Sequence, residues 1–494
     1  MIVQMLSGKV EGVKLDGAYV FRGIPYAAPT GGSRRFKPPA SPLPWQGVRR
    51  SDRYGHVAPQ NPAQEGLLSE LTQSEDCLVL NVWTPQELGD ELKPVMVYIH
   101  GGGFVGGTGV DCEGTKYASE EGIVYVSINY RLGALGFLDL SELLGEEYAT
   151  SGNNGMLDIV AALQWVQHNI ASFGGDPSRV TVIGNSAGAK CVASLYVMPK
   201  AHGLFHRAIA QSGATQAIRN RQAANATTRR LLEQLKISPA DAHRLLELPA
   251  EKLIEAQTAV GFDTSRGLHM FGPVADGLTI PLDPLASLKG NKGLPPLLIG
   301  SNEEEAAIFI HNDPLLRSPD RETLERLLGL NAEVAWAAYQ HYQTSMPPEA
   351  AWNRTLTEHL YAIGAIQFAD AVASTGTPVW MYRLRCGSRL GAIHGFEGSL
   401  IQTALAASSL GSIPALPSDD PYLVTPEMNE LALGMRAAWC AFIRKGDPNT
   451  ELLPAWPVYG QDHATLVLDL VSSVHKDLPT PAGIRVPHQV WRMP

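Results

Sequence analysis

The fold is decided by residues 173–188, which read FGGDPSRVTVIGNSAG. The segment from Arg179 to Ile183 is rich in β-branched apolar residues, which is typical of a buried parallel strand. The next five residues, Gly184 to Gly188, fit the pattern G-x-S-x-G, and a helical run from Ala187 to Val197 overlaps their end. A serine between a strand and a helix predicts a nucleophile elbow, a strained turn that projects the hydroxyl above the sheet.

The residues around Ser186 suit an activated serine. Gly184 and Gly188 carry no side chain that would clash where the strand and the helix cross. The start of the following helix offers free N–H groups and a positive dipole end, which favour a developing oxyanion. The alternative is a serine in an ordinary glycine-flanked turn, and it requires that the rest of the chain supply no catalytic partners.

A second glycine-rich segment follows a strand predicted over residues 94–99. It reads His100-Gly101-Gly102-Gly103-Phe104. Three glycines leave backbone N–H groups bare, so a ligand can approach them closely. Alone, this segment would be interpreted as a flexible surface loop. Together with Ser186, it predicts the second half of an oxyanion hole.

Strands and helical runs alternate along most of the chain. Further strands are predicted at 123–128, 208–211, 297–300, 379–384 and 466–470, and a helix at 156–171. This rhythm predicts an α/β fold with a mostly parallel central sheet and helices on both faces. Residues 7–60 suit a small antiparallel sheet at one edge. The helical segments at about 222–260 and 320–375 are predicted to be cap insertions.

The best-defined helix lies near the C-terminus. Thr425 is its predicted N-cap, Pro426 its first residue and Gly446 its end. An apolar stripe along it is predicted to be core packing; it comprises Met428, Leu431, Met435, Trp439 and Phe442.

The bulk composition excludes several classes. The 494 residues would suit about three domains by length, but no linker, repeat or low-complexity tract divides them, so we expect a single domain over 1–494. The net charge of −10 disfavours binding to nucleic acid. Residues 1–12 resemble no signal peptide, and no apolar stretch is long enough to span a bilayer.

The cysteines are Cys77, Cys112, Cys191, Cys386 and Cys440, which are few, odd in number and widely spaced. This pattern favours reduced thiols in a cytoplasmic protein over a disulfide framework or a zinc site.

A serine nucleophile needs a base, and the base needs an orienting acid. The predicted strand at 297–300 leads into Glu303-Glu304-Glu305, and one of these three glutamates is the expected acid, although spacing alone does not choose between them. Among the histidines that follow, His394 stands in a glycine-rich loop after the strand at 379–384, where a base is expected. Each of the other histidines is more simply a surface residue.

Several further motifs occur in the order found in one family. They are FRGIPYA at 21–27, EDCLVLNV at 75–82, NYRLG at 129–133, QSG at 211–213, FGPVADG at 271–277, GDPN at 446–449 and WPVY at 456–459. With the glycine loop and the elbow, the chain resembles the type-B carboxylesterases, the cholinesterase-like branch of the α/β-hydrolase fold. It is most similar to their bacterial para-nitrobenzyl-esterase-like members.

The resemblance implies roles for single residues. Ser186 matches the nucleophile, His394 the base and Glu305 the acid, with Glu304 where the family has Asp. The oxyanion donors match the N–H groups of Gly102, Gly103 and Ala187, and Ser212 matches a serine that braces the triad.

Three positions depart from the family pattern. Asn185 replaces a glutamate beside the nucleophile, so a buried charge is missing there. Ala306 replaces the glycine that follows the acid, which keeps Glu304 as the alternative acid. Ile159 stands where a glutamine is common.

Two absences narrow the substrate. No cysteine precedes Cys77, so the loop that is bridged in animal relatives is unbridged here. Residues 55–76 contain no tryptophan to hold a quaternary ammonium, so a choline ester is an unexpected substrate.

The resulting expectation is a bacterial serine carboxylesterase that uses no cofactor and no metal. Its partners are a small-molecule ester and water, which accepts the acyl group, and a monomer is favoured. Two alternatives stay open: an amidase or carbamate hydrolase with the same triad, and a non-catalytic cholinesterase-like binding module. The second normally lacks the nucleophile and is secreted.

Overall fold

The computed structural model describes residues 1–61, 70–110, 113–263, 270–407 and 420–476. The chain divides into two compact units. Unit 1 contains Met1–His206 and Ala217–Pro284, and unit 2 contains Arg207–Gln216 and the described residues from Leu285 onward. The single domain expected from sequence stays a prediction.

Unit 1 is built on strands in the order β3-β4-β6-β8-β7-β9. Their bounds are β3 (Val13–Leu15), β4 (Ala18–Pro25), β6 (Val79–Pro85), β8 (Val124–Ile128), β7 (Lys93–Ile99) and β9 (Gly175–Asn185). Strands β8, β7 and β9 run parallel, whereas β3, β4 and β6 add antiparallel pairs. The strands predicted at 94–99, 123–128 and 179–183 are confirmed. Their continuous apolar composition matches their burial, since all residues of β8 are buried.

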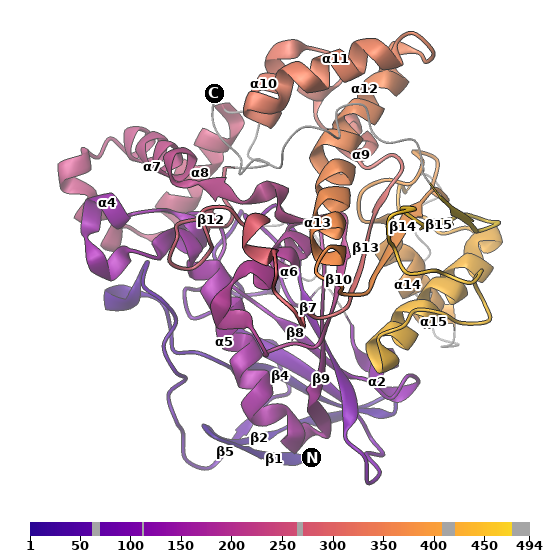
Figure 1. Cartoon of the computed structure of the whole chain (residues 1–494). Coiled ribbons are helices and arrows are strands. Elements are labelled where there is room, and N and C mark those ends of the chain that lie inside the picture. The colour runs from indigo at the N-terminus through magenta and orange to yellow at the C-terminus, as the bar shows by residue number, and fades with distance from the viewer. Residues whose placement is uncertain (62–69, 111–112, 264–269, 408–419, 477–494) are drawn as a thin grey trace. The chain divides into compact units, whose positions relative to one another are not determined.

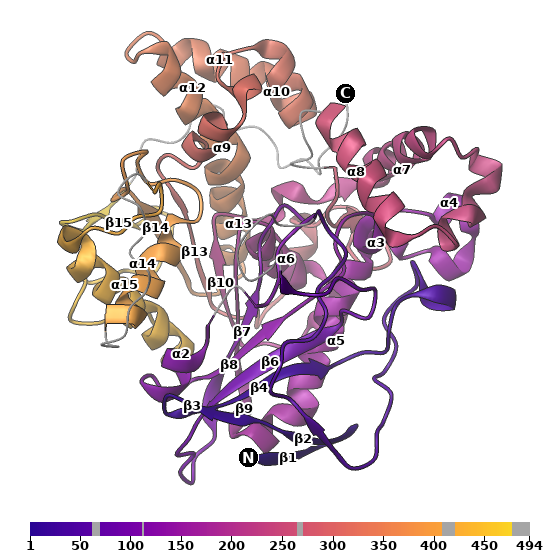
Figure 2. The ribbon, with the colours of Figure 1, turned by 180° about the vertical axis from the view of Figure 1, so that it is seen from behind.

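Two helices follow from the same alternation of strand and helix. Helix α5 (Asn154–Asn169) lies in front of the unit 1 strands in Figure 1 and behind them in Figure 2. A 3₁₀ turn, Ile170–Phe173, extends α5 to Gly174, whose positive φ of 82° ends the element. Helix α6 (Ala187–Val197) has the bounds predicted from sequence, and every one of its residues is buried.

The N-terminal region departs in part from expectation. A small antiparallel sheet was predicted within residues 7–60. Strand β2 (Gly8–Glu11) pairs in antiparallel fashion with β1 (Ile2–Met5), which lies before that range, and in parallel with β5 (Val48–Arg50). The remaining elements of unit 1 are α2 (Thr115–Ser119), α3 (Gly133–Phe137), α4 (Ser141–Leu144), β11 (Arg219–Asn220), α7 (Arg221–Leu235), α8 (Ala250–Asp263) and β12 (Val274–Ala275).

Unit 2 contains the parallel strands β10 (Arg207–Gln211), β13 (Leu297–Asn302), β14 (Val379–Leu384) and β15 (Thr465–Leu468), and β16 (Ser473–His475) is antiparallel to β15. All four parallel strands were predicted, although β15 ends two residues early. The helices are α9 (Ala307–Asn312), α10 (Arg321–Leu328), α11 (Ala332–Tyr342), α12 (Pro348–Thr357), α13 (Ile363–Ala373), α14 (Phe396–Ala407) and α15 (Asn429–Lys445). Helices α10 to α12 gather beyond one end of β13 in Figure 1.

The start of the C-terminal helix was predicted wrongly. Pro426–Met428 forms a 3₁₀ turn, and α15 begins only at Asn429. The Thr425 hydroxyl caps no backbone N–H; it donates to Glu427 Oε2 at 2.8 Å. Gly446 ends the helix as predicted, with φ 77°. The apolar stripe is buried as expected, and Trp439 and Phe442 pack against rings of β14.

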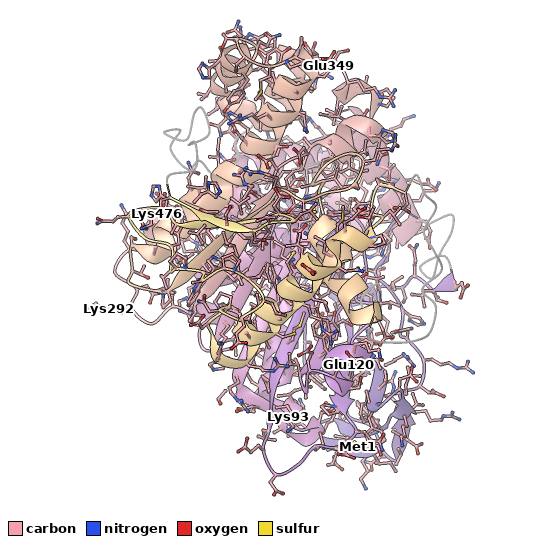
Figure 3. All side chains as sticks on the ribbon, turned by 90° about the vertical axis from the view of Figure 1, so that its right-hand side faces the viewer. Met1, Lys93, Glu120, Lys292, Glu349 and Lys476 are labelled. Carbon is pink, nitrogen blue, oxygen red and sulfur yellow. The ribbon has the colours of Figure 1, made fainter. Side chains whose placement is uncertain are left out.

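Charged side chains occur on the outside of each unit as well as in its interior. Figure 3 labels Glu120 on unit 1 and Lys292, Glu349 and Lys476 on unit 2, all of which are exposed. Within the described ranges, no helix is both long and apolar enough to cross a membrane. Four of the five cysteines are buried free thiols, and Cys112 lies outside the described residues.

Candidate active site

Ser186 occupies a strained turn in unit 1. It directly follows β9 and stands at the N-cap of α6 with φ 58° and ψ −122°. A serine in this region of backbone space costs on the order of 1–3 kcal/mol, and such strain persists only where the surroundings enforce it. The side chain is half-buried. This is the backbone that a nucleophile elbow requires.

The glycines on either side of Ser186 are required by close backbone contacts. A Cβ added to Gly184 would lie 2.4 Å from the Gly188 carbonyl carbon. A Cβ added to Gly188 would lie 2.0 Å from the Ile99 carbonyl oxygen, at the end of β7. Any side chain would therefore push the elbow away from the strand beneath it.

The glycine loop 101–103 packs directly against this elbow. A Cβ on Gly101 would stand 2.8 Å from the Asn185 oxygen and 3.2 Å from Ser186 Cβ. Gly102 and Gly103 have φ values of 102° and 62°, which favour glycine. Within the described part of the chain, the N–H groups of Gly102, Gly103 and Ala187 donate to no acceptor. They are therefore available to an anionic ligand.

His100 anchors the loop and remains neutral. Its Nδ1–H donates to the Gly101 oxygen at 2.9 Å, and its ring stacks on Tyr130 with centroids 4.5 Å apart. The Tyr130 hydroxyl donates to the His100 carbonyl at 3.0 Å. Burial lowers the pKa of His100 to about 4, and the hydrogen bond to Gly101 offsets this only in part.

Unit 2 brings Glu305 and His394 together. His394 Nδ1 lies 2.6 Å from Glu305 Oε2, and both side chains are buried. The other carboxylate oxygen accepts the N–H of Asn302 at 2.7 Å, which fixes the carboxylate plane. His394 Nε2 has no hydrogen-bond partner among the described residues. This imidazole is thus held through one nitrogen and open at the other, which suits a general base.

The two neighbouring glutamates point elsewhere. Glu304 is partly buried, and its carboxylate accepts the Ala392 N–H at 2.8 Å. Burial raises the pKa of Glu304. Glu303 forms a partly exposed ion pair with Arg385 at 2.8 Å. Of the three candidates, only Glu305 contacts His394 in the described structure.

A second buried carboxylate, Glu397, was missed by the sequence reasoning. It is fully buried at the start of α14, and its two oxygens accept from Ser212 Oγ at 2.9 Å and Asn302 Nδ2 at 2.6 Å. Burial, followed by the nearby Glu305, raises the pKa of Glu397. Its spacing of three residues after His394 was the available signal, but an acidic residue in the first turn of a helix is common.

Ser212 is strained like Ser186. Its φ is 57°, it is fully buried, and it follows β10 directly. Its hydroxyl reaches Glu397 and not Glu305. The brace that the resemblance implied therefore runs through a carboxylate that the family motifs did not single out.

Aromatic rings flank His394. The Tyr361 centroid lies 4.7 Å and the Phe309 centroid 5.2 Å from its ring. Tyr361 belongs to a π-helical turn, Glu358–Ala362, between α12 and α13. The carbonyl of His394 accepts from the Tyr422 hydroxyl at 3.1 Å. These contacts restrict the ring and shield it from water.

The departures from the family pattern fit locally. Ala306 has φ −76°, where a side chain is allowed, and its N–H donates to Thr357 Oγ1 at 3.0 Å. Ile159 is fully buried in α5. Asn185 is half-buried as the last residue of β9. No cluster of three potential metal ligands occurs among the residues that the structure describes.

Comparison with known proteins places the chain in a family. The sequence matches the carboxylesterase family over residues 1–480. It is 36% identical over 491 residues to the para-nitrobenzyl esterase of Bacillus subtilis (strain 168), covering 96% of each chain. It is 34% identical to the phenmedipham hydrolase of Pseudarthrobacter oxydans, covering 98% of each.

A solved structure agrees with these relatives. A carboxylesterase of Geobacillus stearothermophilus superimposes with a TM-score of 0.85 at 36% identity, covering 99% of this chain and 100% of that one. The α/β-hydrolase fold class expected from sequence is therefore confirmed. The chain belongs to the carboxylesterase family and is a carboxylic ester hydrolase.

Proposed function

We propose that the chain hydrolyses small-molecule esters through an acyl-enzyme formed on Ser186. His394 takes the serine proton and returns it to the leaving alcohol, and Glu305 orients the imidazole. The N–H groups of Gly102, Gly103 and Ala187 hold the oxyanion. Water then attacks the acyl-enzyme with His394 again as the base, which releases the acid and restores Ser186.

The observation that carries this proposal is the backbone of Ser186. A non-glycine residue at φ 58° and ψ −122° is costly. It is followed by Ala187 and packs against Gly101, and the N–H groups of Ala187, Gly102 and Gly103 have no acceptor among the described residues. Both observations are explained if Ser186 attacks a carbonyl carbon and the unpaired N–H groups bind the oxyanion that forms. The 2.6 Å contact of Glu305 with His394 supports the base and its orientation within unit 2.

The decisive variant is Ser186→Ala. We expect kcat to fall by about 10⁴-fold or more, because nucleophile and base act as a unit. Ser194→Ala is the matched control, since Ser194 is a buried serine of α6 whose hydroxyl donates to the Lys190 carbonyl at 2.8 Å. An organophosphate should label Ser186 alone. Activity above a few per cent in folded Ser186→Ala, or label on another residue, would refute the assignment.

Matched ester and anilide substrates test the reaction class. The expected result is fast turnover of the ester and slow turnover of the anilide with the same acyl group. Comparable rates on both would indicate an amidase. A series of para-nitrophenyl esters of graded chain length would then define the acyl preference.

We further propose a monomeric enzyme of a bacterial cytoplasm. The four described cysteines are buried free thiols, as expected in a reducing compartment. Light scattering at micromolar concentration tests the monomer, and thiol titration of the unfolded protein freshly isolated from cells tests the redox state.

A further inference from the structure

Arg219 in unit 1 is a buried cation that the proposed catalysis does not use. It is fully buried in β11, which pairs with β12. Its Nη2 donates to two carbonyls, that of Phe137 at 3.0 Å and that of Gly272 at 2.8 Å. Its Nη1 donates to the Met270 carbonyl at 2.5 Å. One guanidinium therefore joins the C-terminal end of α3 to the segment 270–272.

The charge of Arg219 has no direct carboxylate partner among the described residues. Burial lowers its pKa to about 10, and the attraction of Asp139 offsets only part of that effect. Its partners are three carbonyls and, at 3.5 Å, the Thr227 hydroxyl, and a buried cation bound only by neutral groups is an expensive way to stabilise a fold. Stability therefore does not explain why Arg219 is buried here, and the positions of its hydrogen-bond partners suggest another role.

The two carbonyls that share Nη2 belong to Phe137 and Gly272, which both pack against the Phe104 ring and form two walls of its site. The ring of Phe104 meets that of Phe137 edge-on, with centroids 5.3 Å apart. A Cβ on Gly272 would lie 3.1 Å from the Phe104 ring, so Gly272 already packs against it. Phe104 is fully buried with φ 64°, and its carbonyl accepts the Gly133 N–H, at the start of α3, at 2.7 Å.

Phe104 directly follows Gly103 in the glycine loop. We propose that Arg219 is a positioning residue for the oxyanion hole, because it fixes both walls of the Phe104 site and thereby holds the N–H groups of Gly102 and Gly103 in place. The inference rests on the proposed function of those N–H groups. Arg219 itself touches neither the substrate nor Ser186 in this assignment.

The expected effect is a loss of transition-state stabilisation. Removing one oxyanion donor costs about 10²- to 10³-fold in kcat. Arg219→Met removes the three carbonyl contacts but leaves the donors present and less well placed. We therefore expect kcat to fall by about 10- to 100-fold with KM changed by less than about twofold. Arg219→Lys keeps a charge and fewer directed bonds, so its loss should be intermediate.

Arg221→Met is the matched control. Arg221 lies two residues further on, its side chain is 38% exposed, and its Nε is 3.8 Å from Asp139 Oδ2. Arg221→Met removes an arginine close to Arg219 in sequence but leaves the contacts with Phe137 and Gly272 intact, so kcat should stay within about twofold of wild type.

The experiment measures kcat and KM per active site, counted by organophosphate label, and inhibition by a trifluoromethyl ketone whose adduct carries an oxyanion. We expect the ketone to bind Arg219→Met about 10- to 100-fold more weakly, in step with kcat, and Arg221→Met normally. A lower melting temperature with unchanged kcat and ketone affinity would overturn the proposal, since it shows a structural role only.

If Arg219→Met does not fold, Arg219→Lys decides by the same two readouts: at least about fivefold losses in both are expected, and wild-type values would overturn the proposal. Failure of the proposed function is detected separately, because wild-type protein would then carry no label on Ser186.

Discussion

Replacement of Glu305 by glutamine tests the acid–base half of the site most directly. In the wild-type structure the Asn302 N–H donates to Glu305 Oε1 at 2.7 Å. The amide oxygen of the glutamine can still accept this hydrogen bond. The amide NH₂ group must then face His394 Nδ1, which stands 2.6 Å from Oε2. Two donors would oppose each other, so we expect the imidazole to adopt the other tautomer and present N–H at Nε2. A base with that tautomer accepts no proton from serine.

The magnitude follows from the lost charge. Proton transfer creates an imidazolium beside the buried Glu305, with charge centres about 4 Å apart. At an effective dielectric of about 20, this interaction contributes about 4 kcal/mol. Each 1.36 kcal/mol corresponds to a factor of ten in rate, so kcat should fall by about 10³-fold. Losses of about 10⁴-fold are known for comparable changes in serine triads.

The neighbouring glutamates provide internal controls. Glu303→Gln weakens an ion pair whose two side chains are 37% and 44% exposed, so stability should change by no more than about 1 kcal/mol and kcat by less than about twofold. Glu304→Gln retains an acceptor for the Ala392 N–H. The kcat of Glu304→Gln should lie between those of the other two variants, with a decrease below about tenfold.

The three variants are assayed side by side with one para-nitrophenyl ester at pH 8, and their folding is checked by urea unfolding. The reasoning fails if Glu305→Gln keeps more than a tenth of wild-type kcat while folded. It also fails if Glu304→Gln is the most damaging change, because the acid would then be one residue earlier.

Three further outcomes are expected. Glu397→Gln should retain the hydrogen bonds of Ser212 and Asn302 and stay within about 1 kcal/mol of wild-type stability. Glu397→Ala leaves two buried donors unpaired and should lower the free energy of urea unfolding by about 2–6 kcal/mol. Equal stability of the two variants would contradict this. The pKa of His100 is about 4 in the folded state and 6.5 in the unfolded state, so the unfolded state binds more protons between pH 4 and 6.5. The neutral His100 therefore contributes about 3 kcal/mol to the free energy of unfolding above pH 6.5, and this contribution is lost as the pH falls to 4. His100→Gln should therefore flatten the unfolding free energy between pH 7 and 4, and an unchanged slope would exclude His100 as its source. Dialysis against a strong chelator should leave ester hydrolysis unchanged, since His202 and His206 have H-x-x-x-H spacing but no group of three potential metal ligands occurs among the described residues; inhibition reversed by zinc would show the opposite.

The elements beside the elbow were predictable because local chemistry and tertiary packing agree there. Strand β9 and helix α6 meet at residues 184–188, where only glycine fits the backbone contacts at positions 184 and 188, and the predicted bounds of α6 are those observed. The helix after Thr425 shows the opposite case. Proline at the first position is compatible with both α and 3₁₀ geometry, so the 3₁₀ turn at Pro426–Met428 is invisible in the sequence.

The choice among Glu303, Glu304 and Glu305 lay beyond pattern reasoning for a physical reason. Strand β13 continues to Asn302, two residues past its predicted end. The turn that follows then decides which glutamate faces the interior. Three consecutive glutamates have the same composition, so the sequence does not indicate which side chain points inward. In the structure, the buried Asn302 N–H binds the carboxylate of Glu305 and so selects it. The family pattern supplied the assignment that the residues themselves left open.

Asn302 also explains why two buried carboxylates stand side by side. Its backbone N–H binds Glu305 and its side-chain Nδ2 binds Glu397. Two like charges in a dry site disfavour each other, and the raised pKa of Glu397 follows from burial first and from Glu305 second. Glu397 therefore holds a proton to a higher pH than an ordinary glutamate, and in that neutral form its O–H can donate to Ser212 Oγ, which accepts as well as donates. Of the two carboxylates, only Glu305 contacts the His394 ring among the described residues, so it is the one that orients the imidazole, whereas Glu397 binds Ser212 and Asn302 and holds that network in place.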